Sequence, residues 1–148
     1  MSSSVELTTL STKNRRYDDV HQQKSTGATY TPSDFANFLA NQIISTADLP
    51  EHGEIRVLDP AVGNGALLEA LLTRMPTEAL GRVLVFGYDT DPIAVAQASS
   101  RLKKTFPNTS ITIKEKDFLE HVLCLNGYTD LFSPPQAANL YFDLVIAN

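Results

Sequence analysis

Acidic and amide side chains stand at the ends of apolar segments, where they could bind a polar ligand. Asp59 precedes a glycine loop, and Asp89, Asp117 and Asn148 each come at or near the end of a later predicted strand. Carboxylates accept hydrogen bonds from hydroxyls or amines, and an amide oxygen does the same. In a parallel sheet ligands bind beyond the carboxyl ends of the strands, so the four residues are expected to meet on one rim.

The loop after Asp59 reads Pro60-Ala61-Val62-Gly63-Asn64-Gly65. Its two glycines allow the backbone to approach a ligand without an intervening Cβ. Leu68 stands at the third glycine position of the dinucleotide fingerprint, and no Gly-Lys-Ser or Gly-Lys-Thr follows. The pattern therefore favours a ligand with a nucleoside and one carboxylate over a diphosphate. A tight strand-to-helix turn without a ligand is the alternative.

Among the residues that follow the loop in the sequence, three have both a binding and a structural interpretation. Asp89 follows Gly65 at close to the offset of roughly 20 residues at which an acidic residue meets a ribose, or else it begins a cap with Asp91. Asp117 could accept from an exocyclic amine such as adenine N6, or else cap the next helix. Phe118 could offer its ring to a base, or else belong to the core.

Alternating strands and helices would position these residues. We expect strands at 55–59, 83–86, 111–113 and 141–147, and helices from 31–32 to about 45–47, at 66–75, at 92–104 and at 119–125. This order implies right-handed crossovers and a parallel sheet, which is an α/β fold. The first helix should begin with Thr31 as its N-cap and bury one apolar face made of Phe35, Phe38, Leu39 and Ile43.

Composition limits the class of protein. The chain has 148 residues, 43% hydrophobic and 20% charged, which is typical of one globular domain. Its net charge of −5 argues against a stand-alone nucleic-acid binder. Neither a secretory signal nor an apolar run of membrane-spanning length is present, so a cytoplasmic protein without membrane contact is expected. The lone Cys124, expected to be buried, and three histidines without ligand spacing predict no disulfide and no metal site.

Two regions are expected along the chain. Residues 1–24 are polar, without a sustained apolar period, and are interpreted as a mobile arm. Residues 25–148 form the predicted binding domain. Within it five motifs occur in order: Gly27-Ala28-Thr29-Tyr30-Thr31-Pro32, the loop from Asp59 to Gly65, Gly87-Tyr88-Asp89-Thr90-Asp91-Pro92, Lys116-Asp117-Phe118-Leu119 and Tyr141-Phe142-Asp143-Leu144-Val145-Ile146-Ala147-Asn148.

This ordered set resembles the N6-adenine DNA methyltransferases of bacterial restriction–modification systems, in the gamma arrangement that places the extra N-terminal motif first. The resemblance runs from Gly27 to Asn148. It implies a Rossmann-like class I methyltransferase fold with S-adenosylmethionine as the methyl donor. It also implies that Tyr30, Thr31 and Pro32 lie near the methionine end of the donor, together with the loop residues Asp59, Pro60, Ala61, Gly63 and Gly65.

The resemblance implies roles for the remaining motif residues as well. Asp89 would accept from the ribose hydroxyls, and Asp117 would accept from the adenine amine beside the Phe118 ring. Asn148 matches the first residue of the catalytic tetrapeptide Asn-Pro-Pro-aromatic, where it would accept from the target amine and orient its lone pair. The target base would be flipped out of the DNA duplex.

The sequence departs from the family pattern at two places. Val62 stands where the glycine motif often has Cys, which leaves recognition by the backbone intact. The sequence ends at Asn148, before the two prolines and the aromatic, so we expect an incomplete sheet and an inactive polypeptide. DNA contact would need the absent C-terminal regions, and a restriction subunit or a complementary C-terminal fragment is the expected partner. The alternatives are a methyltransferase for RNA or for protein glutamine, or a non-catalytic remnant that binds S-adenosylmethionine.

Overall fold

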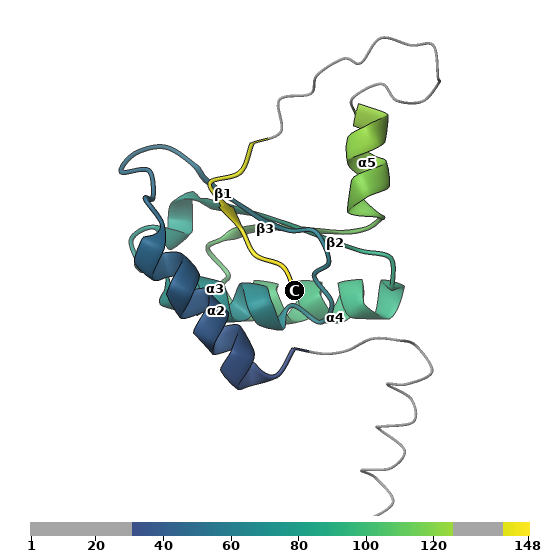
Figure 1. Ribbon diagram of the computed structural model, residues 1–148, viewed down its shortest axis with the longest axis horizontal. Coiled ribbons are helices and arrows are strands. Elements are labelled where there is room, and N and C mark those ends of the chain that lie inside the picture. The colour runs from purple at the N-terminus through teal and green to yellow at the C-terminus, as the bar shows by residue number, and fades with distance from the viewer. Residues whose placement is uncertain (1–30, 126–140) are drawn as a thin grey trace, which may run out of the picture.

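The alternation of strands and helices that the sequence predicts is confirmed. A computed structural model of the chain describes residues 31–125 and 141–148, so the expected arm and Tyr30 lie outside the described residues. The strands are β1 (Ile55–Asp59), β2 (Val83–Asp89), β3 (Ser110–Glu115) and β4 (Leu144–Val145). The helices are α2 (Ser33–Thr46), α3 (Ala66–Arg74), α4 (Pro92–Thr105) and α5 (Phe118–Leu125), with a short 3-10 helix at Leu80–Arg82 (Figure 1). None of these described helices has the length and apolar character needed to cross a bilayer.

The four strands form one parallel sheet in the order β3-β2-β1-β4. In the register Asp59 lies beside Gly87, and Val57 lies beside Leu144. Because the strands are parallel, their carboxyl ends share one edge, as the sequence predicts. Crossover helices connect β1 to β2 and β2 to β3, which confirms the α/β class.

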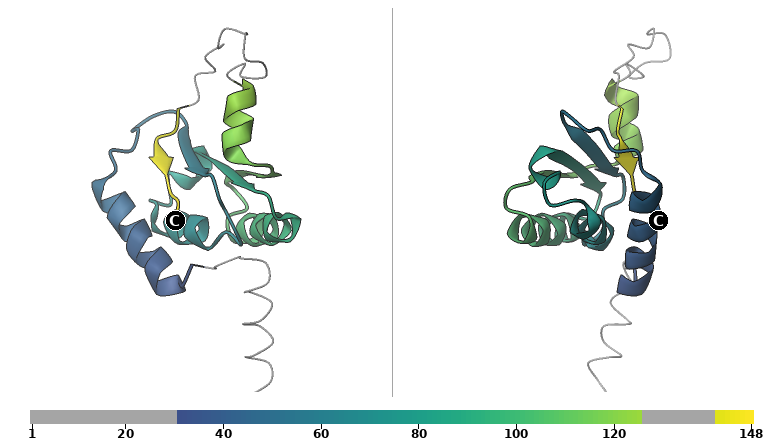
Figure 2. Two further views of the ribbon diagram at one scale, coloured as in Figure 1. Left: turned by 45° about the vertical axis from the view of Figure 1, so that its right-hand side comes forward. Right: turned by 90° about the vertical axis from the view of Figure 1, so that its left-hand side faces the viewer.

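Helices α3 and α4 pack on one side of the sheet, and α5 stands on the other side (Figures 1 and 2). The alternate strand residues Ile55, Val57, Val83 and Val85 are almost completely buried in one core with the helices. Leu68, Leu71 and Leu72 of α3 and Ala98 and Leu102 of α4 complete that core. This packing fixes the position of the sheet edge that carries the polar residues, because the same strands supply the buried core residues and the polar residues at their ends.

The first helix differs from its prediction in its cap and in its buried face. Helix α2 begins at Ser33 with Pro32 at the N-cap, and no side chain among the described residues caps it. The Thr31 hydroxyl instead accepts a hydrogen bond from Asn148, which removes it from the capping position. Phe35 and Phe38 are 46% and 56% exposed, so the predicted apolar face is wrong at these two residues. The small residues Ala36 and Ala40 are buried instead, which lets α2 approach the core closely.

The last strand is shorter than predicted, since it covers only Leu144–Val145 instead of 141–147. The Arg56 N–H donates to Asp143 Oδ2 at 2.7 Å, so a side chain replaces a backbone acceptor at that point of the ladder. The Arg56 guanidinium lies over the Phe86 ring at 5.3 Å, which anchors this end of β1. The expectation that Cys124 is buried is also wrong, because its side chain on α5 is exposed.

A close approach of α3 to α4 at Gly65 predicts the cost of a side chain there. Gly65 has φ 83°, and a Cβ would lie 3.2 Å from Ala98 Cα. We expect Gly65→Ala to lower the free energy of unfolding by about 2 kcal/mol, because the new methyl group adds crowding to an unfavourable backbone conformation. Urea denaturation measures the change.

The matched control for this substitution is Gly81→Ala. A Cβ on Gly81 would meet no atom within 4 Å, and the φ of Gly81 is not positive. The stability of this variant should therefore stay within about 0.5 kcal/mol of the parent. Equal losses for the two variants would contradict the close approach of α3 and α4.

Candidate functional site

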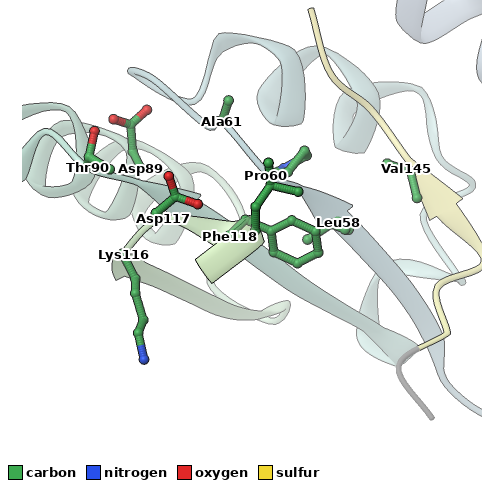
Figure 3. A pocket seen from close by; sticks show the side chains of 10 residues that line it. Leu58, Pro60, Ala61, Asp89, Thr90, Lys116, Asp117, Phe118 and Val145 are labelled. Carbon is green, nitrogen blue, oxygen red and sulfur yellow. The ribbon is translucent and has the colours of Figure 1, made fainter. Parts of the chain in front are cut away.

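A cleft of about 500 Å³ opens at the carboxyl ends of β1, β2 and β3 (Figure 3). Among the residues predicted from the sequence, five line it: Pro60, Ala61, Asp89, Asp117 and Phe118. Leu58, Leu119 and Val145 add apolar surface, and Thr90 adds a hydroxyl. The cleft thus combines a mostly apolar wall with two carboxylates, which is the composition of a site for a nucleoside-sized ligand.

Asp89 holds the glycine loop against the end of β2. Its Oδ2 accepts from the Gly63 N–H at 2.8 Å, and its Oδ1 accepts from the Asp91 N–H at 2.9 Å. Asp91 in turn caps α4 by accepting from the Ile93 N–H at 2.8 Å, so the cap belongs to Asp91. A carboxylate offers about four lone pairs, which leaves Asp89 able to accept further hydrogen bonds in the cleft.

Asp117 and Phe118 lie together where the chain passes from β3 into α5, which begins at Phe118. Asp117 Oδ1 accepts from the Glu120 N–H at 3.1 Å, so the capping interpretation that the sequence left open is realised while the residue also lines the cleft. The half-buried Phe118 ring packs 5.1 Å from the Tyr88 ring, centroid to centroid. In Figure 3 the Phe118 ring lies beside Leu58, and the Lys116 ammonium points away from the carboxylates. Phe118 therefore contributes to packing and also forms a wall of the cleft.

Asp59 is a buried carboxyl at the end of β1. Its side chain is 0% exposed, and its Oδ1 accepts from the Ala61 N–H at 3.0 Å. Its Oδ2 is buried without a hydrogen-bond partner among the described residues. Burial raises the pKa of Asp59 to about 7; the Ala61 hydrogen bond opposes the shift and the charge of Asp89 adds to it. An unpartnered buried carboxylate oxygen fits a cationic ligand group such as an ammonium.

A small hollow of about 40 Å³ lies next to the cleft, between the glycine loop and the end of β4. Thr31 and Asn148 line one part of it, and Ala61, Gly63 and Asn64 line another. Asn148 Nδ2 donates to Thr31 Oγ1 at 2.7 Å. Since Ala61 lines both the hollow and the cleft, a ligand that extends along the loop would reach both spaces.

Three predicted site residues, Asp59, Gly65 and Pro32, are not among the residues that line these spaces. Gly65 is buried behind the loop against Ala98, where its role is the close approach of two helices. Pro32 is exposed at the start of α2. Sequence reasoning missed Leu58, Thr90 and Val145 as lining residues. Thr90 could have been found, because it directly follows Asp89 at the strand end, whereas Leu58 and Val145 become neighbours only through the pairing of β1 with β4.

The sequence comparison finds a bacterial methyltransferase that is similar to this chain. No protein-family model matches the chain. The chain is 33% identical over 132 residues to the type II methyltransferase M.BanIII of Aneurinibacillus aneurinilyticus, a match that covers 86% of this chain and 22% of that protein. The chain thus spans about a fifth of the length of the curated relative that it matches.

Solved structures agree with the chain in fold. The methyltransferase subunit of a type I restriction–modification system from Streptococcus thermophilus superposes with a TM-score of 0.52 at 17% identity, over 80% of this chain and 22% of that one. A methyltransferase from Geobacter sulfurreducens gives a TM-score of 0.52 at 12% identity, over 81% of this chain and 55% of that one.

These likenesses confirm the resemblance to restriction–modification methyltransferases that the sequence predicts. The solved structures also confirm the class I methyltransferase fold. The acceptor groups in this chain fit S-adenosylmethionine, the cofactor that the resemblance implies, because the buried Asp59 Oδ2 suits an ammonium and the carboxylates of the cleft can accept from hydroxyls and an amine.

The raised pKa of Asp59 predicts a pH-dependent stability. The carboxyl has its ordinary pKa of 3.8 in the unfolded chain and about 7 in the folded chain. Between these values the folded state holds the extra proton, so its stability falls as the pH rises from about 4 to about 8. The loss reaches up to about 4 kcal/mol, since each pKa unit corresponds to about 1.4 kcal/mol.

The variant Asp59→Asn tests this, because Asn still accepts from the Ala61 N–H and does not ionise. The free energy of unfolding, measured by urea denaturation, should rise for the variant relative to the parent between pH 4 and pH 8. The difference between the two proteins cancels the titration of all other groups. A difference that stays constant over this range would contradict the shift at Asp59.

Proposed function

We propose that this chain is the cofactor-binding part of a DNA methyltransferase that methylates adenine at N6 in a restriction–modification system. The observation that carries the proposal is the position of Asn148. It follows β4 beyond Ile146 and Ala147, is hydrogen-bonded to Thr31 and lines the same hollow as the glycine loop. This arrangement brings a carboxamide next to the loop expected to hold the methyl donor.

The cleft residues supply the recognition that the donor requires. We assign the ribose hydroxyls to Asp89 and the adenine amine to Asp117, with the Phe118 ring beside the base. The buried Asp59 Oδ2 is assigned to the ammonium of the donor, and the backbone at Ala61 and Gly63 to its methionine portion. The order of these residues along the rim supports the assignment, because Ala61 and Gly63 line the hollow with Asn148 and the cleft extends from Ala61 to Asp117.

The catalytic role belongs to Asn148. When bound, S-adenosylmethionine supplies an electrophilic methyl group. The Asn148 Oδ1 would accept a hydrogen bond from the amine of the target adenine and so orient the nitrogen lone pair. As the new N–C bond formed, the methyl–sulfur bond of the donor would break, its demethylated product would leave, and the amine would lose one proton. An exocyclic amine is a weak nucleophile, so its orientation contributes much of the catalytic effect. The base leaves the duplex to reach this site, which is the behaviour of enzymes that act on a base within DNA.

The first prediction of this proposal concerns the cofactor. Isothermal titration calorimetry should show binding of S-adenosylmethionine or its demethylated product, and no binding of NAD. Asp89→Ala should weaken the binding about 10- to 100-fold, because it removes a charge-assisted hydrogen bond worth about 1.5–3 kcal/mol. Asp34→Ala removes an exposed carboxylate of α2 and serves as the matched control. Equal affinities of the Asp89 variant and the parent would refute the ribose assignment.

The second prediction concerns the reaction. Methyl groups from labelled S-adenosylmethionine should enter unmethylated DNA, and nucleoside analysis should find them as N6-methyladenine. The assay uses a longer polypeptide that contains this chain, with Asn148→Ala as the inactive variant. Label in RNA or in protein glutamine would replace the DNA assignment with one of these substrates. Cofactor binding without transfer to any of them would favour a non-catalytic binding module.

A further inference from the structure

The hydrogen bond from Asn148 to Thr31 joins the two ends of the described chain. The residues are 117 positions apart, and Nδ2 lies 2.7 Å from Oγ1. This distance is short for a hydrogen bond between an amide and a hydroxyl. Because a carboxamide is planar, donation from Nδ2 to a fixed hydroxyl also fixes the direction in which Oδ1 points.

Both partners of this hydrogen bond lie within a few residues of regular structure. Thr31 precedes Pro32, the N-cap of α2, and the first turn of the helix closes with a bond from the Ala36 N–H to the Pro32 carbonyl at 2.9 Å. Asn148 lies two residues after the buried Ile146, whose N–H donates to the Leu58 carbonyl at 2.9 Å. The hydroxyl therefore lies close to the start of α2, and the carboxamide lies close to the backbone pairing with β1.

The hydroxyl and the carboxamide line the same small hollow as Ala61, Gly63 and Asn64. A Cβ built on Gly63 meets no atom within 4 Å, so the space in front of the loop is open at this point. The Thr31 hydroxyl is engaged with Asn148 and does not cap α2.

We propose that Thr31 is a positioning residue for Asn148, whose hydroxyl holds the carboxamide so that Oδ1 is presented to the amine of the target base. This inference rests on the function proposed above. It differs from the cofactor contact that the resemblance implies for Thr31, because it predicts an effect on the methyl-transfer step and not on donor binding. The hydroxyl acts through Asn148 and does not touch the reacting atoms.

The variants Thr31→Val and Thr31→Ser separate the two roles. Valine has nearly the shape of threonine without the hydroxyl, and serine restores the hydroxyl. We expect Thr31→Val to lower kcat for methyl transfer about tenfold or more, since a small misplacement of a positioning group slows catalysis strongly. The Kd for S-adenosylmethionine, measured by calorimetry, should stay within about twofold of the parent value, because the substitution affects the transfer step and not the binding of the donor. Thr31→Ser should keep most of kcat, and Ser33→Ala, at the exposed first residue of α2, should match the parent.

A second measurement does not depend on activity. In ¹H–¹⁵N spectra the Asn148 side-chain amide protons of the parent should be shifted from the values of a solvated asparagine, and Thr31→Val should return them toward those values. Dispersed backbone signals in the same spectrum show that the variant is folded. Asn148→Ala assigns the resonances, because the pair disappears in that variant.

The outcomes distinguish this inference from the proposed function. A longer polypeptide that contains this chain, binds the donor and methylates no substrate refutes the proposed function and removes the catalytic purpose of the contact. A parent that methylates adenine, together with a Thr31→Val variant of unchanged kcat and tenfold weaker donor binding, refutes only the positioning role. If the chemical shifts of the Asn148 side-chain amide protons do not change in Thr31→Val, the contact is likewise refuted.

Discussion

The site depends on the attachment of one loop to the end of one strand. Two hydrogen bonds make this attachment: the Val62 N–H donates to the Tyr88 carbonyl at 2.8 Å, and the Gly63 N–H donates to Asp89 Oδ2 at 2.8 Å. The strand accommodates the loop because Gly87 has no Cβ, which would lie 3.2 Å from Val62 Cβ. The loop thereby joins the carboxyl ends of β1 and β2 into one surface, and both the cleft and the hollow are built on it.

The same attachment concentrates negative charge. Asp59 and Asp89 end neighbouring strands, and Asp89 raises the pKa of the buried Asp59 further than burial alone does. Backbone N–H groups at Ala61, Gly63 and Asp91 offset part of this cost by donating to the two carboxylates. The unpartnered Asp59 Oδ2 shows that this compensation is incomplete among the described residues. A positively charged ligand group near Asp59 Oδ2 would complete this compensation. The energetic cost of the buried carboxylate in the unliganded protein would then be offset on binding, which would favour such a ligand.

The sequence predicts the parts of this architecture whose signals are local. The strand at Ile55–Asp59 and the cap at Asp91 follow from an apolar run and from a capping residue before proline, and both occur as predicted. Contacts between distant segments decide the rest. Thr31 had a plausible local use as a cap, but its hydroxyl accepts from a side chain 117 residues away. Phe35 and Phe38 have the spacing of a core face, yet alanines occupy the buried side of α2. Helical spacing alone does not identify the buried side, because large and small apolar residues can both line an interface between helices. The roles of the individual residues in binding stay predictions.

The alanines of α2 connect the packing of the fold to its site. A helix with large side chains at positions 36 and 40 would stand farther from α3, since the distance between packed helices depends on the side chains at the contact. Ala36 and Ala40 are 1% and 0% exposed, so α2 lies close to the core. This proximity carries the chain before α2 to the glycine loop, where Thr31 meets Asn148. The first helix therefore contributes to the site through its closeness to the core, although none of its large apolar side chains lines the cleft or the hollow.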